Sequence, residues 1–162
     1  MLRNVLTLLF IASALLFAAP AWSYDAVAAQ GYEAMFATAH GAKVGKELHL
    51  LPPDKFIEKT KKGETLVVLD IRTPAERSVI GMTYKDTLNI SLNDLFKKEN
   101  LSRLPTDRPI VVVCQSGIRG TAAATALRHV GFKNAFILKG GMKGLISSFG
   151  PKEANTPLAK KK

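Results

Sequence analysis

The sequence predicts an α/β fold in which a central parallel sheet is flanked by helices on both faces. Two short apolar runs, 66–69 (LVVL) and 110–113 (IVVV), have the length and β-branched content of strands that are buried on both sides. The second run leads through a Gly/Ser-containing turn into a segment with helical apolar spacing. A buried strand followed by a short turn and a helix is the repeating unit of parallel sheets, so these patterns favour an α/β domain.

Residues 1–23 have the pattern of a secretory signal peptide. A short basic start with Arg3 precedes fifteen apolar residues, 5–19, and Ala21 and Ser23 lie where a signal peptidase requires small side chains. Fifteen apolar residues are few against the roughly 20 of a membrane-spanning helix. We expect cleavage after Ser23, or after Ala21, a periplasmic mature protein, and no stable membrane insertion after cleavage. An uncleaved anchor is the alternative.

The composition limits the classes of partner and of architecture. The 139 residues after the signal peptide suffice for one domain, and a single cysteine cannot form an internal disulfide. The net charge is +10, yet no nucleic-acid-binding motif is present, and four lysines lie in the expected tail, 151–162. We therefore expect no nucleic-acid partner. The remaining positive charge favours a small anionic substrate.

The remaining elements are assigned in chain order. An N-terminal extension at 24–47 has helical composition, and the globular domain is expected at 48–150, followed by a basic flexible tail. Residues 48–51 are expected to form an edge strand. Asp54 is expected to cap a helix that runs to Lys61.

The second half of the domain repeats the strand-and-helix pattern. Asn89 and Ile90 are expected in a strand, and 91–104 in a helix followed by a polar connection. The helix after Gly120 is expected to stop at Gly131, because glycine is favoured just beyond helix ends. Asp70 and Arg72 follow the 66–69 strand, and ligands of open α/β sheets bind at the carboxyl ends of strands, so both should lie near the turn after 110–113.

That turn begins with the only cysteine, Cys114, and continues Gln-Ser-Gly-Ile-Arg to Arg119. A strand-to-helix junction directs several backbone N–H groups and a helix N-terminus at one point, where they stabilise an anion. A cysteine at that point should ionise more easily than a free thiol, and the thiolate is the nucleophilic form. A small buried core cysteine is the alternative, but a Gly/Ser/Arg turn is a poor core segment.

The segments 66–76 (LVVLDIRTPAE) and 111–142 (VVVCQSGIRGTAAATALRHVGFKNAFILKGGM) resemble the rhodanese family. The first matches the Asp-x-Arg-x-x-x-Glu segment of that family, and the second matches its strand, Cys-x-x-Gly-x-Arg loop, helix, strand and Gly-Gly turn. The resemblance implies a rhodanese-like fold and a sulfurtransferase that takes a sulfane sulfur from a donor such as thiosulfate onto Cys114 as a persulfide.

The resemblance also implies the site and its partners. Cys114 would be the catalytic residue, and the substrate would be bound by the loop residues Gln115, Ser116, Gly117, Ile118, Arg119 and Gly120. Asp70 and Arg72 would support the loop or simply pair with each other. The donor would be a small sulfur anion and the acceptor a thiol or a cyanide-like nucleophile, with a protein acceptor allowed. No metal and no organic cofactor is implied.

Two stretches depart from the family pattern. After Glu76 the family has an aromatic residue and then Gly-His-Ile, whereas 77–82 reads RSVIGM, without histidine and with one extra residue. Leu145 stands where a tryptophan is usual after the Gly-Gly turn. These changes leave the sulfur chemistry in place but concern substrate fit and packing near the pocket.

Two other functions compete with sulfur transfer. Cysteine phosphatases and arsenate reductases also place a cysteine at such a loop, but they use Cys-x5-Arg, and here Arg119 comes one residue early. An arsenate reductase would also need a resolving cysteine. A non-catalytic sulfur carrier or binding module with the same fold would keep the thiol, and the sequence does not distinguish it from an enzyme.

Overall fold

The computed structural model describes residues 23–157; all of the expected signal peptide except Ser23, and the last five residues, lie outside this range. The chain divides into two compact units, Met1–Ala34 and Met35–Lys162. Helix α2 (Ala26–Phe36) occupies most of the described part of the first unit and extends into the second. It buries none of its residues, and Val27 is 80% exposed.

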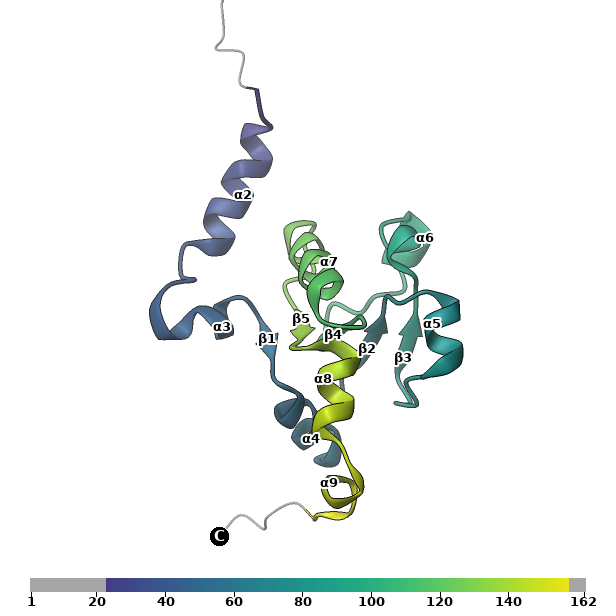
Figure 1. Ribbon diagram of the computed structural model, residues 1–162. Helices are drawn as coiled ribbons and strands as arrows, with labels where there is room; N and C mark the ends of the chain where they lie inside the picture. Colours follow the sequence, from purple (N-terminus) through teal and green to yellow (C-terminus); the bar gives the residue numbers. More distant parts are fainter. Residues whose placement is uncertain (1–22, 158–162) are drawn as a thin grey trace, which may run out of the picture. The chain divides into compact units, whose positions relative to one another are not determined.

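The second unit is built on a sheet of five parallel strands in the order β1-β5-β4-β2-β3 (Figure 1). The strands are β1 (Leu50–Leu51), β2 (Val67–Asp70), β3 (Thr87–Asn89), β4 (Ile110–Val113) and β5 (Ala135–Leu138). The parallel α/β prediction is therefore confirmed, with the expected edge strand near residue 50 at one end of the sheet.

The two apolar runs of the sequence are the central strands. Every residue of β2 and β4 is buried, and the two strands pair in register from Val67 opposite Ile110 to Asp70 opposite Val113. Because side chains alternate along a strand, each run supplies both faces of the sheet with apolar groups. Cys114 follows β4 directly and is level with the end of β2.

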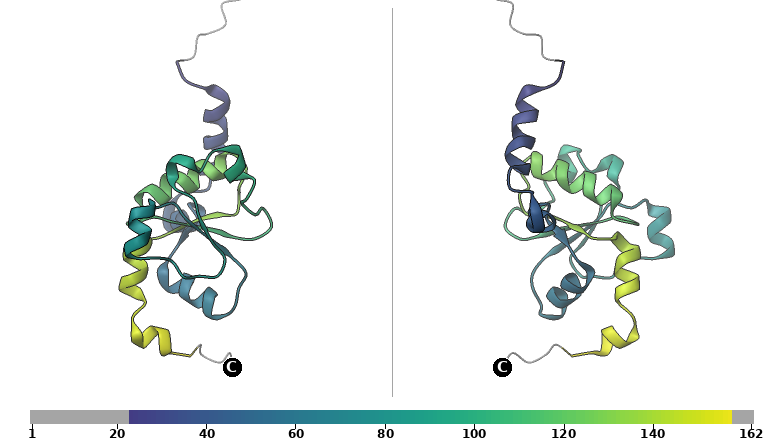
Figure 2. Two further views of the ribbon diagram at one scale, coloured as in Figure 1. Left: turned by 90° about the vertical axis from the view of Figure 1, so that its right-hand side faces the viewer. Right: turned by 60° about the vertical axis from the view of Figure 1, so that its left-hand side comes forward.

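Helices cover both faces of this sheet (Figure 2). On one face α7 (Ile118–His129) packs Ala123, Ala124 and Leu127 against the sheet. On the other face α4 (Pro53–Lys61) and α8 (Gly141–Ser148) supply the buried apolar groups, which are Phe56, Ile57, Met142 and Leu145. The alanines of α7 let its backbone approach the sheet closely.

The shorter elements connect these layers at the sheet edges and at the ends of the unit. They are η2 (Gly41–Lys43), α3 (Val44–Glu47), α5 (Pro74–Val79), η3 (Leu92–Asp94), α6 (Lys98–Leu101) and α9 (Pro151–Asn155). Within the described residues 23–157, no helix has the length and hydrophobicity needed to cross a membrane.

Three local expectations differ from the structure. Helix α4 begins at Pro53, whose missing N–H costs nothing in a first turn, so Asp54 lies inside the helix and does not cap it. Residues 91–96 form only a 3₁₀ turn. The first residues of the expected flexible tail form α9, where the Lys61 ammonium binds Glu153 at 2.7 Å.

The turn after β5 packs directly on the turn after β4, with backbone against backbone. Gly141 has a φ of +57°, and a Cβ there would lie 2.3 Å from the Cys114 carbonyl oxygen and 2.7 Å from the Gly117 nitrogen. Gly117 lies on the other side of this backbone contact, because a Cβ added there would lie 3.1 Å from the Gly140 nitrogen. No larger side chain fits at Gly141 without moving the cysteine loop.

We predict that Gly141→Ala lowers the free energy of unfolding by about 2–5 kcal/mol, combining left-handed backbone strain with a steric overlap. Urea unfolding measures this change. Gly45→Ala is the matched control, because its Cβ would meet nothing nearer than a Leu50 methyl at 3.9 Å. Equal stability of the two variants would contradict the close approach.

Candidate functional site

Cys114 lies at the carboxyl end of β4 and is almost wholly buried, with 1% of its surface exposed. Its Sγ accepts hydrogen bonds from the backbone N–H groups of Gly117 at 3.1 Å and Gly120 at 3.2 Å. Such bonds are strongest to an acceptor that carries negative charge. The structure thus places two donors where the sequence predicted an anion-stabilising junction.

The loop is shorter than the sequence suggested, because α7 begins inside it. Gly117 caps the helix in the left-handed conformation, with φ of +95°, and α7 starts at Ile118. Ile118, Arg119 and Gly120 therefore form the first turn of the helix. Gln115 and Ser116 are exposed and form the tip of the turn, and backbone N–H groups of Gly117 and Gly120 donate to the sulfur. Binding of substrate by the loop residues stays a prediction.

A second helix N-terminus holds the loop from the side of β5. The backbone N–H of Met142 donates to the Cys114 carbonyl at 2.8 Å, and that of Lys143 donates to the Gln115 carbonyl at 3.0 Å. Both donors belong to the first turn of α8. The N–H groups of a first turn have no carbonyl acceptor within their own helix, so they are free to bind the loop. The sequence pointed to a Gly-Gly turn here but not to its contact with the loop.

Arg119 is held by Glu76, which lies 43 residues earlier in α5. The Arg119 Nη1 lies 3.0 Å from Glu76 Oε2, and Nη2 lies 2.5 Å from Oε1. Glu76 also completes a capping box with Thr73, whose N–H donates to Oε2 at 2.9 Å. The guanidinium fork of Arg119 thus binds a carboxylate of the fold, and its binding of substrate stays a prediction.

These bonds determine the ionisation of Glu76. The bonds from Arg119, and then that from the Thr73 backbone, hold the pKa of the Glu76 carboxyl at about 2, against an ordinary 4.5. Bonding to Glu76 likewise raises the pKa of Arg119. Both groups remain charged through the physiological range, so the pair ties the first turn of α7 to α5.

Asp70 and Arg72 lie at the same sheet edge and pair with each other, as one of the two sequence readings expected. The Arg72 Nη2 lies 2.7 Å from Asp70 Oδ2, and its Nε lies 3.0 Å from Oδ1, with both side chains buried. The Arg72 backbone N–H also donates to Asp70 Oδ1 at 3.0 Å. The pair shapes the turn after β2, and both carboxylate oxygens of Asp70 accept hydrogen bonds from Arg72.

His49, which is half-buried beside β1, serves the fold. His49 packs on the Phe136 ring at 4.7 Å, and its Nδ1 lies 3.1 Å from the Ala135 carbonyl, while burial lowers the pKa of its imidazole. Among the residues that the structure describes, no three His, Cys, Asp or Glu side chains gather as a metal site. Cys114 provides a nucleophile at this edge of the sheet.

We predict that Glu76→Gln removes part of the acid sensitivity of the fold. The folded pKa of Glu76 is lower than its unfolded value, so the Glu76–Arg119 pair stabilises the protein above about pH 4.5 and loses this effect as the pH falls toward 2. Between these values, the wild type should lose up to about 1 kcal/mol more stability than the variant, a small loss because the pair is partly exposed.

Denaturant unfolding at a series of pH values measures this difference, and Arg119→Gln supplies the control. In an Arg119→Gln background, the Glu76 substitution should change the acid dependence less than it does in the wild type, because only the bonds from Thr73 then remain to Glu76. If wild type and Glu76→Gln lost stability in parallel below pH 4.5, the ion pair would not hold the loop.

Comparison with known proteins identifies relatives of the globular unit. The chain is 32% identical over 100 residues to the thiosulfate sulfurtransferase GlpE of Pseudomonas fluorescens, covering 60% of this chain and 84% of that protein. It is 34% identical over 79 residues to a sulfurtransferase of Allochromatium vinosum, covering 49% and 70%. The match to the probable adenylyltransferase/sulfurtransferase MoeZ of Mycobacterium tuberculosis, 29% identical, spans 57% of this chain but only 23% of MoeZ.

Solved structures agree with the fold. A rhodanese-related protein of Thermoplasma volcanium superposes with a TM-score of 0.54 at 26% identity, over 64% of this chain and 95% of that one. The rhodanese-like domain of an Anabaena protein gives 0.54 at 22% identity, over 70% and 88%. Residues 52–148, more than half of the sequence, match the rhodanese-like domain family. The chain belongs to the rhodanese-like domain family.

Proposed function

We propose that this protein is a sulfurtransferase that moves a sulfane sulfur from thiosulfate or a persulfide donor to a thiophilic acceptor through a persulfide on Cys114. The observation that carries the proposal is the pair of backbone N–H groups directed at Sγ from 3.1 and 3.2 Å. Relatives named as sulfurtransferases support the reaction class. The choice of thiosulfate as donor is part of the proposal.

The first half-reaction needs a thiolate and a good leaving group. The Cys114 thiolate attacks the outer sulfur of thiosulfate, the S–S bond of the donor breaks, and sulfite leaves with its electron pair. The new sulfur then carries the negative charge. Backbone N–H groups of the loop are suited to this charge because they are fixed before the reaction begins.

The second half-reaction regenerates the enzyme. An acceptor nucleophile, such as a thiolate or cyanide, bonds to the outer sulfur of the persulfide, and the S–S bond to Cys114 breaks to return the thiolate. No proton transfer is required in either half-reaction. The absence of an obvious general base from the sequence therefore fits the proposed reaction.

Arg119 acts in this proposal as a positioning residue. Two of its N–H groups are committed to Glu76, which fixes the first turn of α7 and with it the Gly120 N–H at the sulfur. The guanidinium remains partly exposed, with 36% of the side chain accessible, so its charge still attracts an approaching anion. Its main effect is on the geometry of the loop.

We predict that thiosulfate adds one sulfur, about 32 Da, to the wild-type protein and none to Cys114→Ser. Intact-mass spectrometry measures the addition, and release of thiocyanate with cyanide measures turnover. Val130→Ser is the control, because this exposed side chain lies at the far end of α7 from the loop. Turnover in Cys114→Ser would exclude the persulfide mechanism, and a stable persulfide without turnover would favour a sulfur carrier.

We further propose that the protein is exported and acts in the periplasm, on the basis of the signal-peptide pattern in residues 1–23. In that compartment the mature N-terminus should be Tyr24, with Trp22 as the second choice. N-terminal sequencing of protein recovered from a periplasmic extract checks this prediction. Recovery of an intact Met1 on membrane-bound material would support the uncleaved anchor instead.

A further inference from the structure

We propose that an apolar pocket beside the cysteine loop is the docking site for a partner protein, which inserts an apolar side chain there while its cysteine exchanges sulfur with Cys114. This inference depends on the proposed function and names the class of its acceptor or donor. The pocket has a volume of about 320 Å³ and lies between α4, α8 and the segment 80–84.

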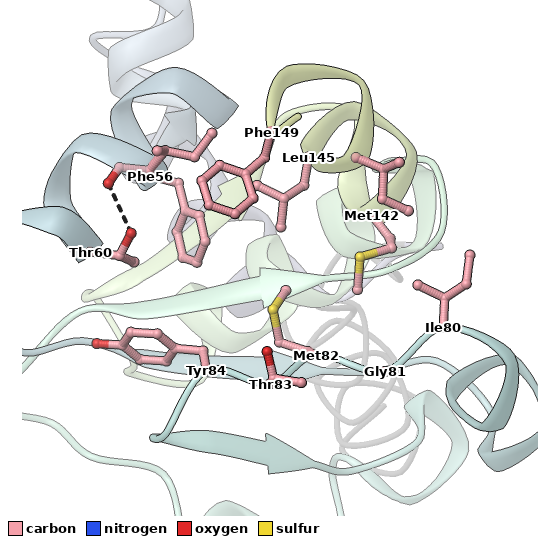
Figure 3. Close-up of a pocket in the computed structure, with 12 residues that line it drawn as sticks. Phe56, Thr60, Ile80, Gly81, Met82, Thr83, Tyr84, Met142, Leu145 and Phe149 are labelled. Atoms are coloured by element: carbon pink, nitrogen blue, oxygen red, sulfur yellow. Dashed lines mark hydrogen bonds between the residues drawn. The ribbon is translucent and has the colours of Figure 1, made fainter. Parts of the chain in front are cut away.

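The pocket is lined by large apolar side chains from three separate parts of the chain. Figure 3 shows the side chains of Phe56 of α4, Phe149 beyond the end of α8, and Met82 turned toward one another. Met142 and Leu145 of α8 form the buried side of the pocket. Methionine adapts to differently shaped apolar partners, so such a lining suits an inserted side chain.

The rim of the pocket is apolar and exposed as well. Ile80, Ile146 and Phe149 are 43%, 48% and 46% exposed, and Val79 beside them is 81% exposed. Exposed apolar residues are ordinary when they are scattered, but a cluster around a hollow marks an interaction site.

Two chain segments, α5 and the first turn of α8, connect this apolar surface with the cysteine loop. Glu76 of α5 binds Arg119 in the first turn of α7, and Val79 and Ile80 lie one helical turn beyond Glu76. Ile118, which precedes Arg119, is 79% exposed. On the other side, Met142 lines the pocket while its N–H holds the Cys114 carbonyl at 2.8 Å.

The pocket and the sulfur face opposite sides of β4, which indicates the size of the partner. Val111 and Val113 point toward the apolar cluster of α4 and α8, whereas Val112 and Cys114 belong to the cluster beneath α7. A small acceptor in the pocket would therefore lie across the strand from the sulfur. A polypeptide segment can place one side chain in the pocket and a cysteine at the loop, since its side chains are spaced at about 3.3 Å per residue.

The charges around this surface indicate an acidic partner. Lys139 and Lys143 flank the turn that holds the loop, and both side chains are exposed. In the described part of the chain, neither forms an ion pair with a carboxylate, and the Glu76 charge is matched by Arg119. Lys143 and Ile146 lie one turn apart on α8, so a segment that carries an apolar residue beside acidic ones would meet complementary groups.

The test compares two synthetic peptides as acceptors for the Cys114 persulfide. One has the sequence Cys-Gly-Glu-Leu-Phe-Glu, and the control has Cys-Gly-Lys-Ser-Ser-Lys. With the full chain, the apolar-acidic peptide should discharge the persulfide with a kcat/KM about tenfold or more above the control, the effect of one buried interface anchor. Ile146→Ser and Lys143→Glu should each reduce this ratio toward one.

Two variants and a small acceptor serve as controls. Val130→Ser removes an equally exposed apolar residue at the far end of α7, and Lys98→Glu reverses a charge on α6, so both should keep the wild-type ratio. Discharge to cyanide should be unchanged in Ile146→Ser, Val130→Ser and Lys98→Glu. A ratio near one in the wild type, or a full ratio in Ile146→Ser, would overturn docking at the pocket.

A binding experiment separates this inference from the proposed function. In protein labelled with 13C on its methionine methyl groups, the apolar-acidic peptide with serine in place of cysteine should shift the Met82 and Met142 signals and leave Met35 of α2 unchanged. Absence of persulfide in the wild type would refute the proposed function, whereas absence of these shifts would refute docking, even in an enzyme that turns over thiosulfate.

Discussion

The site depends on a contact between two stretches of backbone, the turn after β4 and the turn after β5. The first turn of α8 donates two N–H groups to carbonyls of the cysteine loop, and Gly141 leaves no room for a side chain between them. These main-chain hydrogen bonds between the two turns hold the loop, and the Glu76–Arg119 pair holds the first turn of α7 beside it. The positions of the Gly117 and Gly120 N–H groups at Sγ follow from this constraint.

Local patterns in the sequence predicted the centre of the fold well. The runs 66–69 and 110–113 became the two fully buried strands, because a continuous β-branched run satisfies both faces of a parallel sheet. The single cysteine at the end of the second run identified the loop. The predictions of the two strands and of the loop succeeded for the same reason. Strand burial and a strand-to-helix turn are both determined within about ten residues of chain.

Contacts between distant residues could not be predicted in the same way. The guanidinium of Arg119 is a common ligand for anions in proteins. Only the fold reveals that it forms hydrogen bonds with the carboxylate of Glu76, which lies 43 residues away in the sequence. The Gly-Gly turn was visible in the sequence, but its closeness to Cys114 depends on the pairing of β4 with β5. Asp54 was wrongly expected to cap α4 because aspartate is a frequent cap, whereas Pro53 is equally suited to start the helix.

Under the proposed function, chemistry and recognition are encoded in different parts of this site. Backbone N–H groups donate hydrogen bonds to the sulfur. The exposed side chains of Gln115, Ser116 and Ile118 can therefore differ without changing how a negative charge on the sulfur is stabilised. The departures of the sequence from the rhodanese pattern agree with this division, because Met82 and Leu145, at the two divergent stretches, both line the apolar pocket. Both changes reshape a surface beside the loop and leave the hydrogen bonds at Cys114 intact. Under the proposed function, a change of sulfur partner with the same reaction would require changes at such a surface.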